Sequence, residues 1–436
     1  MRQVMNGRWP PTRPVSAVTT TRTASPSRSR RPGLSRPPTA PSLRPGDTPP
    51  PRLPTMGPVN DSRPPAALPL RADLAGLHPY GAPRIDVPVV LNVNENPYAP
   101  SPEVVRDIAD AVARAAAGAN RYPDRDALTL RGELADYLRA ETGVELSADQ
   151  VWAGNGSNEV LLHVLQAYGG VGRTMLTAAP SYSMYPEYAR DTQTAFVTVP
   201  RTEDFRVDVD ATLAAMAEHR PSVLVLASPN NPTGTALTAD ELTRLLATAA
   251  TSGPAGPDGE SLATVVVVDE AYAEFRRAGT PAAHELLADN PHLVVARTMS
   301  KAFGMAGLRL GYLAASKEIV DHLQVVRLPY HLSDITQAAA LAALGHRESL
   351  MSQVAELRAE RDALAEHLTS VGLTVAESDA NFVFFGRFED RHAVWESLVE
   401  HGVLIRETGP DGWLRVSVGT PEENARFRAA LNEVLS

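Results

Sequence analysis

Short apolar segments alternate with segments of helical character along most of this chain, from residue 91 onward. The apolar, β-branched segments lie at 222–227, 264–268, 292–296, 382–385 and 413–418. The four valines at 265–268 show no polar alternation, which indicates a strand buried on both faces. Strands that alternate with helices predict an α/β fold, with a mostly parallel sheet covered by helices on both sides.

Several helix starts are marked by capping residues. Ser101 stands before Pro102, and proline is favoured at the first position of a helix. The segments 238–241 and 420–423 both have the Thr-x-x-Glu spacing of a capping box. By contrast, residues 251–260 contain three glycines and two prolines, which predicts a surface loop.

The length of 436 residues favours two domains of unequal size. A break near Leu328 and Pro329 separates a large domain, expected at 118–328, from later helices around 333–345 and 349–372. We expect a smaller domain to combine 329–436 with 75–117.

Residues 1–65 differ in composition from the rest of the chain. Within 1–60 there are fourteen of the 37 prolines, ten arginines and one acidic residue, Asp47. Such a segment cannot bury enough apolar surface to offset its ordering entropy, so we predict a disordered tail. It has no apolar core of a secretory signal. Three interpretations stay open: synthesis that starts at Met56, a dispensable native tail, or an organelle-targeting segment.

The overall charge and composition exclude several classes of function. A formal charge of −10 argues against general nucleic-acid binding, which needs a basic surface. The chain has no cysteine, which excludes disulfides and thiolate metal sites and fits a reducing compartment. There is no run of about eighteen apolar residues, so we expect no membrane span.

Lysine chemistry in this chain is confined to two positions. Among 41 basic residues there are only two lysines, Lys301 and Lys317. Arginine stays charged, so it is a poor partner for an aldehyde. Lys301 has hydroxyls nearby at Thr298 and Ser300 and a guanidinium at Arg309, a combination suited to binding phosphate. Lys317 stands beside an acidic residue at a helix start, as expected of a solvated side chain.

Polar residues that follow the predicted strands should meet in one crevice, at the carboxyl ends of the sheet. Asp269 comes directly after a buried strand and needs either a cationic partner or a helix to cap. Residues 228–234 form a rigid Asn-Pro-Gly turn that could present an amide to a ligand. The glycine-containing turn at 154–159 opens a helix and could offer N–H groups to an anion.

These segments resemble the fold type I aminotransferases that depend on pyridoxal 5'-phosphate (PLP), most closely the histidinol-phosphate aminotransferases. The motifs are NENP at 94–97, NRYP at 120–123, SPNNPTG at 228–234, DEAY at 269–272 and SKAFGMAGLRLG at 300–311. The resemblance covers about 75–435. It implies a large domain with a mostly parallel sheet, a smaller α+β domain, and a cytoplasmic homodimer. The implied reaction is transamination between histidinol phosphate and 2-oxoglutarate in histidine biosynthesis.

The resemblance also implies how the cofactor would be held. Lys301 would bind it covalently and later move a proton, and Asp269 would pair with the ring nitrogen. Tyr272 and Asn231 would donate to the ring oxygen, and Tyr182 would stack on the ring. The phosphate would be bound by Gly156, Ser157, Asn158, Thr298, Ser300 and Arg309, and by Tyr122 acting on the neighbouring subunit.

On the substrate side, the resemblance implies no metal but a set of polar side chains. These are Tyr80, Asn94, Arg406 and Arg415. Arg415 would bind the anion beside the amine, and Arg406 with Tyr80 would complete a phosphate site, unless Arg406 instead pairs with Glu407 or another acidic residue on the surface. Asn94 and Glu95 are the nearest candidates to contact an imidazole.

Three other functions remain open at this point. They are an aminotransferase for aromatic amino acids, a PLP-dependent decarboxylase such as a threonine-phosphate decarboxylase, and a PLP-sensing regulator without catalysis. The regulator would need a helix-turn-helix module ahead of the aminotransferase region, which the proline-rich tail cannot provide. Activity with glutamate as amino donor would separate the first two.

Overall fold

The computed structural model of the protein describes residues 68–79 and 81–436. The expected tail and the candidate Tyr80 therefore lie outside the described residues. Residue contacts divide the chain after His78 into two units. In the first unit, the described residues form one short 3-10 helix, η1 (Ala72–Leu74). The second unit contains every other described element.

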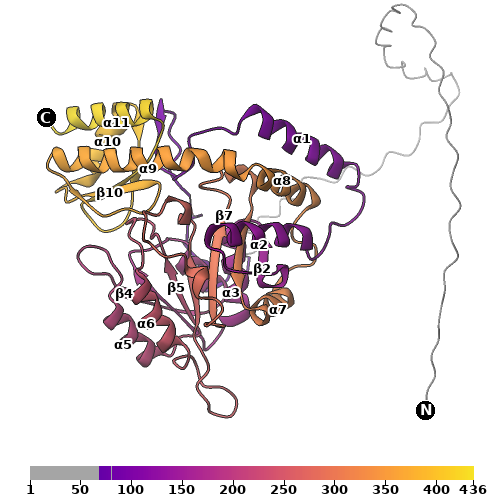
Figure 1. Ribbon diagram of the computed structural model, residues 1–436. Coiled ribbons are helices and arrows are strands. Elements are labelled where there is room, and N and C mark those ends of the chain that lie inside the picture. Colours follow the sequence, from indigo (N-terminus) through magenta and orange to yellow (C-terminus); the bar gives the residue numbers. More distant parts are fainter. Residues whose placement is uncertain (1–67, 80) are drawn as a thin grey trace, which may run out of the picture. The chain divides into compact units, whose positions relative to one another are not determined.

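A seven-stranded sheet forms the centre of the second unit, with strand order β2-β8-β7-β6-β5-β3-β4 (Figure 1). Its strands are β2 (Val151–Gly154), β3 (Thr174–Ala179), β4 (Ala195–Pro200), β5 (Val223–Ala227), β6 (Val265–Asp269), β7 (Leu293–Thr298) and β8 (Gly311–Ala315). The neighbours from β4 to β7 are parallel, and β8 is antiparallel to both β7 and β2. The mostly parallel α/β sheet is confirmed, with one reversed strand that the apolar pattern had not predicted.

Helices cover both faces of this sheet. One layer contains α2 (Leu128–Thr142), α5 (Val209–His219), α6 (Ala239–Ala249) and α8 (Asp334–Gly345), and α1 (Pro102–Ala116) packs on α8. The other contains α3 (Ser157–Tyr168), α4 (Tyr185–Asp191) and α7 (Lys317–Val326). In β6, Val266 and Val268 pack against the first layer, whereas Val265 and Val267 pack against the second. This explains why the strand shows no polar alternation.

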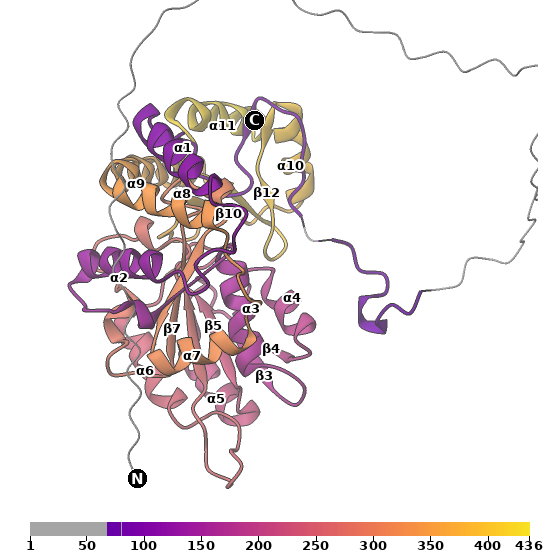
Figure 2. The same ribbon diagram turned by 90° about the vertical axis from the view of Figure 1, so that its right-hand side faces the viewer.

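A smaller antiparallel sheet, of order β12-β13-β10-β9, lies in the C-terminal part of the chain. Its strands are β9 (Thr374–Val375), β10 (Phe382–Gly386), β12 (Arg406–Glu407) and β13 (Trp413–Ser417). The helices α9 (Arg347–Ser370), α10 (Arg391–Glu400) and α11 (Pro421–Val434) share an apolar core with it (Figure 2). β1 (Val89–Val90) pairs with β11 (Val403–Leu404), so an early segment joins this C-terminal part.

The predicted helix starts are confirmed. The Ser101 hydroxyl accepts a hydrogen bond from the Val104 amide at 3.4 Å, and both Thr-x-x-Glu segments form capping boxes. Short 3-10 helices complete the unit: η2 (Ala148–Gln150), η3 (Ala273–Phe275), η4 (Ala283–Leu286) and η5 (Ala306–Leu308). Within the described ranges, no helix has the length and apolar character needed to cross a bilayer.

Candidate active site

A cavity of about 330 Å³ opens at the carboxyl ends of β5, β6 and β7, within the size range of ligand pockets. The site residues expected from the sequence line it, apart from Gly156, Tyr122, Glu95 and the undescribed Tyr80. Residues from the β12–β13 region and from the segment before α1 close the cavity. Side chains from distant parts of the sequence therefore meet at the edge of the sheet, as the strand-end rule predicts.

Lys301 follows β7 and lies on the cavity wall. Its Nζ donates to the Val93 carbonyl oxygen at 3.0 Å and lies 5.8 Å from the ring centre of Tyr272. Burial, assisted by the charges of Arg415 and Arg309, lowers the pKa of the Lys301 amine to about 8. A larger fraction of this amine is therefore uncharged near neutral pH than for an exposed lysine, as a nucleophile or base requires.

Asp269 is the last residue of β6 and is only 5% exposed. It accepts hydrogen bonds from the Tyr185 hydroxyl at 2.9 Å and from the Ala271 amide at 3.2 Å. Burial nevertheless raises the pKa of its carboxyl group to about 6. No basic side chain of the described residues forms an ion pair with it. A carboxylate in this setting fits a cationic ligand atom.

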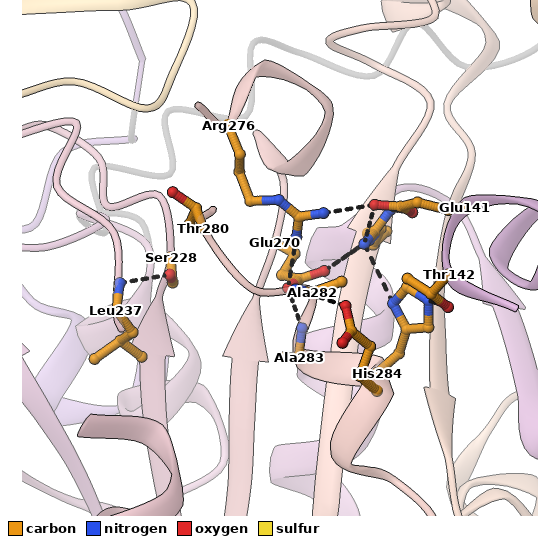
Figure 3. A network of polar contacts seen from close by, with 12 residues as sticks. Glu141, Thr142, Ser228, Leu237, Glu270, Arg276, Thr280, Ala282, Ala283 and His284 are labelled. Carbon is orange, nitrogen blue, oxygen red and sulfur yellow. Dashed lines mark hydrogen bonds and ion pairs between the residues drawn. The ribbon is translucent and has the colours of Figure 1, made fainter. Parts of the chain in front are cut away.

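A network of ion pairs is centred on Glu270, the residue next to Asp269 in the sequence (Figure 3). Glu270, next to Asp269, binds Arg297 of β7 through an Nη2–Oε2 contact of 2.6 Å and also binds Arg276 at 3.1 Å. Both arginines contact Glu141 at the end of α2. Alternate residues of a strand point to opposite faces. The network therefore fixes the ends of β6 and β7 from the side away from the cavity. No pattern in the sequence predicted this network.

The turn after β2 has the features of an anion site. Gly156 has φ of +84°, and a Cβ atom there would lie 2.6 Å from Nη2 of Arg309. Only glycine therefore lets this guanidinium lie against the turn. Ser157 opens α3, where backbone N–H groups lack helical partners. Arg309 also donates to the Ser300 hydroxyl at 3.3 Å, and the Ser300 amide donates to the Thr298 hydroxyl at 3.1 Å.

Two polar contacts orient further side chains of the cavity. The Tyr182 hydroxyl donates to Oδ1 of Asn158 at 3.4 Å. Asn231 accepts a hydrogen bond from Nη1 of Arg415 through its side-chain oxygen. Its amide nitrogen is therefore the atom that remains to donate elsewhere.

Two arginines occupy the part of the cavity formed by β12 and β13. Nη2 of Arg415 donates to the Asn92 carbonyl oxygen at 2.9 Å. Nη1 of Arg406 is buried and has no hydrogen-bond partner among the described residues. The alternative pairing of Arg406 with Glu407 is not formed, because the Glu407 carboxylate instead binds Arg391 at 3.1 Å. Arg406 thus offers a donor to an anion.

Two other residues lie away from the cavity. Tyr122 is 78% exposed, and its ring stacks on that of Tyr330 with centroids 4.4 Å apart. Lys317 starts α7 and is solvated, as the sequence predicted, and it pairs with Asp321 at 2.6 Å. The structure therefore brings Lys301, but not Lys317, to the site.

Sequence reasoning missed several polar residues that the structure places in or beside the site. Tyr185 binds Asp269, Asn92 binds Arg415, and Ser417 binds Asn94. Of these, only Tyr185 carried a signal: it lies three residues after Tyr182, and it is the first residue of α4. The other contacts depend on tertiary structure alone.

Comparison with known proteins defines the class of this chain. Residues 87–431 match the family model for aminotransferases of class I and II, so the chain belongs to that family. It is similar to the histidinol-phosphate aminotransferase of Thermobifida fusca, with 60% identity over 364 residues, 84% of this chain and 95% of that protein. Histidinol-phosphate aminotransferase 3 of Burkholderia lata is 56% identical over 369 residues, 85% of this chain and 96% of that protein.

Solved structures have the same α/β fold. The histidinol-phosphate aminotransferase of Sinorhizobium meliloti, in complex with pyridoxal-5'-phosphate, superposes with a TM-score of 0.68. The two chains are 27% identical, and the match covers 80% of this chain and 91% of the other. The fold is therefore that of the class I and II aminotransferases.

Proposed function

We propose that this chain is a PLP-dependent aminotransferase that exchanges the amino group between histidinol phosphate and 2-oxoglutarate. The observation that carries the proposal is the cavity that joins Lys301, with its lowered pKa, to the buried Asp269 and an arginine-lined anion site. The high identity to histidinol-phosphate aminotransferases supports the choice of substrate.

The residues of the cavity fit PLP in chemical character. The Lys301 amine suits an aldehyde, and the Asp269 carboxylate suits a protonated ring nitrogen. The turn at 154–158, with Thr298, Ser300 and Arg309, suits a phosphate. When bound, the cofactor supplies the aldehyde and a ring that withdraws electrons from the substrate carbon.

Within this proposal, Lys301 has two tasks. Its amine would hold the cofactor through the aldehyde that the cofactor supplies. The same amine would act as a general base toward the substrate carbon that bears the amine, and would also return a proton. A lysine pKa of about 8 suits both the removal and the return of a proton, because neither protonation state is strongly favoured near neutral pH.

Asp269 keeps the ring nitrogen protonated, and a cation there in turn favours the ionised form of this carboxyl group. The buried pairs of Glu270 and Arg297 hold Asp269 in place. Tyr272 and Asn231 would donate to the ring oxygen, and Tyr182 would cover the ring face.

Two arginines of the cavity, Arg406 and Arg415, favour a substrate that carries a phosphate. A single guanidinium can satisfy a carboxylate through a bidentate contact, whereas a phosphate monoester carries nearly two charges and more acceptor oxygens. Arg406, with its unpartnered Nη1, supplements Arg415, and Tyr80 completes this part of the proposal. Asn94 and Glu95 are proposed to contact the imidazole. Glutamate would bind its carboxylate to Arg415.

The proposal includes a homodimer in the cytoplasm. Tyr122 is an aromatic side chain that is 78% exposed within one chain, which fits a contact with a neighbouring subunit. Tyr122 would reach the phosphate in the neighbouring subunit. We also propose that 118–328 forms the large domain and that 75–117 with 329–436 forms the small one.

The substrate is tested by measuring kcat/KM for histidinol phosphate and phenylalanine in the wild type and in Arg406→Ala. The wild type should prefer histidinol phosphate. Loss of Arg406 should cost roughly 1.5–3 kcal/mol of transition-state binding for this substrate and less for glutamate. Arg387→Ala is the matched control, because Arg387 is exposed on the same small sheet and pairs with Glu203.

Two results would contradict the assignment of histidinol phosphate as the substrate. One is a wild-type preference for phenylalanine, and the other is an equal loss for both amines in Arg406→Ala. Release of carbon dioxide without use of glutamate would instead indicate a decarboxylase.

A further inference from the structure

A chain of hydrogen bonds runs from β13 to the cavity through Ser417, Asn94 and Tyr272. The Ser417 hydroxyl accepts from the Asn94 backbone N–H at 2.8 Å and donates to Oδ1 of Asn94 at 2.9 Å. Nδ2 of Asn94 then donates to the Tyr272 hydroxyl at 3.0 Å. All three residues are buried, with exposures of 3%, 2% and 6%.

The backbone N–H fixes the direction of this chain. A backbone N–H can only donate, so Ser417 must be the acceptor in that contact. A serine hydroxyl has one proton, and the side-chain oxygen of Asn94 receives it. In a flipped amide Nδ2 would face Ser417, and the serine proton would lose Oδ1 as its acceptor. Ser417 therefore favours the orientation in which Nδ2 of Asn94 faces Tyr272.

The position of Asn94 is held independently of its side chain. Its backbone has φ of +55°, a left-handed conformation that asparagine tolerates better than most residues. Nδ2 of Asn381 also donates to the Asn94 carbonyl oxygen at 3.1 Å. Because the backbone is fixed, rotation of the amide is the main freedom left to this side chain, and Ser417 removes it.

The orientation of the Asn94 amide affects the cavity through Tyr272. The tyrosine hydroxyl accepts from Asn94, so its own proton must be directed away from Asn94. Tyr272 lines the cavity, whereas Ser417 does not. An inverted amide would present Oδ1 to Tyr272 and compete for the tyrosine proton.

We propose that Ser417 is a positioning residue, which holds the Asn94 amide so that Tyr272 donates its proton to the ring oxygen of the cofactor. This inference rests on the proposed function, in which that oxygen lies within reach of Tyr272. Ser417 acts only through Asn94 and needs no contact with the ligand.

The test uses the PLP-loaded enzyme and follows its absorbance as a function of pH. A hydrogen bond donated to a charged oxygen favours the charged form, so its loss makes protonation of the bound cofactor easier. Ser417→Ala should therefore raise the midpoint of the absorbance change by about one pH unit, the shift that corresponds to one such bond. Ser417→Val should have the same effect, and Ser417→Thr, which keeps the hydroxyl, should stay near the wild type.

Two controls separate this role from a general loss of packing. Ser378→Ala removes another buried hydroxyl, which donates to the Phe382 carbonyl oxygen at 2.6 Å outside the cavity. It should lower the melting temperature without moving the absorbance midpoint. In a Tyr272→Phe background, Ser417→Ala should cause no further shift, because the chain then lacks its last member.

Three outcomes would overturn the inference. They are an unchanged midpoint in both Ser417→Ala and Ser417→Val, an equal shift in Ser417→Thr and Ser417→Val, and a full shift in the Tyr272→Phe background. A wild-type enzyme that shows no absorbance from bound PLP would instead overturn the proposed function itself.

Discussion

Among single residues, the two lysines of this chain lie in opposite environments. Lys301 lies on the cavity wall, donates to the Val93 carbonyl oxygen and has a pKa lowered to about 8. Lys317 is exposed on α7 and paired with Asp321. Both are the same amine chemically, so any difference in reactivity must come from burial and neighbouring charge.

Lys301→Ala should abolish the absorbance of bound PLP and lower kcat by at least about a hundredfold, as expected when a general base is lost. Lys317→Ala should leave both unchanged, because an exposed ion pair contributes little. Borohydride reduction of the loaded wild type followed by peptide mapping locates the modified lysine. Label on Lys317 would contradict the assignment.

Asp269 illustrates a conflict between stability and function at one residue. Its pKa is raised to about 6 in the folded, cofactor-free chain, compared with 3.8 in the unfolded chain. Between these values the folded state binds more protons, so this residue makes stability fall as pH rises from about 4 to 6. Above pH 6 the full cost of an unpaired buried carboxylate is present.

Asp269→Asn should therefore stabilise the cofactor-free chain by roughly 1–2 kcal/mol at pH 7.5 and hardly at all below pH 4. The same variant should lose most of its transaminase activity. Urea unfolding at the two pH values measures the first effect. Equal stabilisation at both pH values would show that the charge of Asp269 is not its cause.

Among the elements, those with strong local signals were predictable from sequence. The starts of α1, α6 and α11 followed from capping residues, and β5, β6 and β7 followed from apolar runs. The reversal of β8 could not be predicted, because strand direction depends on chain connections and not on side-chain pattern. The buried network around Arg297 was missed for a similar reason, since its partners lie far apart in sequence.

This network makes the ends of β6 and β7 sensitive to a single substitution. Arg297 is 1% exposed, and its removal would leave Glu270 as a buried, partly uncompensated charge. Arg297→Met should therefore destabilise the protein by roughly 3–5 kcal/mol. Arg244→Met, which breaks an exposed pair with Asp210, should cost less than about 1 kcal/mol. Urea unfolding of both variants provides the comparison, and similar losses would contradict the role of burial.

For the whole molecule, motif positions predicted most of the cavity. Residues that follow strands β5, β6 and β7 had to converge, because a parallel sheet gathers its carboxyl ends along one edge. The supporting contacts of Asn92 and Ser417 were not predictable, since each joins segments that are far apart in the sequence. Tyr122 neither lines the cavity nor supports a residue that lines it, because within one chain it lies exposed and away from the cavity.

The position of Tyr122 leads to a prediction about the assembled enzyme. If Tyr122 serves the site of the neighbouring subunit, a chain with Lys301→Ala and a chain with Tyr122→Phe have their defects at complementary positions. In a mixed dimer, the site built around the intact Lys301 receives the intact Tyr122 from the other chain. Subunit exchange is first verified with differently tagged chains. Averaged over all dimers, the mixture should then regain up to about half of the activity of one wild-type site. Tyr330→Ala is a useful comparison, because it removes the ring that stacks on Tyr122 without removing the tyrosine hydroxyl. If verified mixed dimers stay as inactive as the two parents, Tyr122 does not act across the interface.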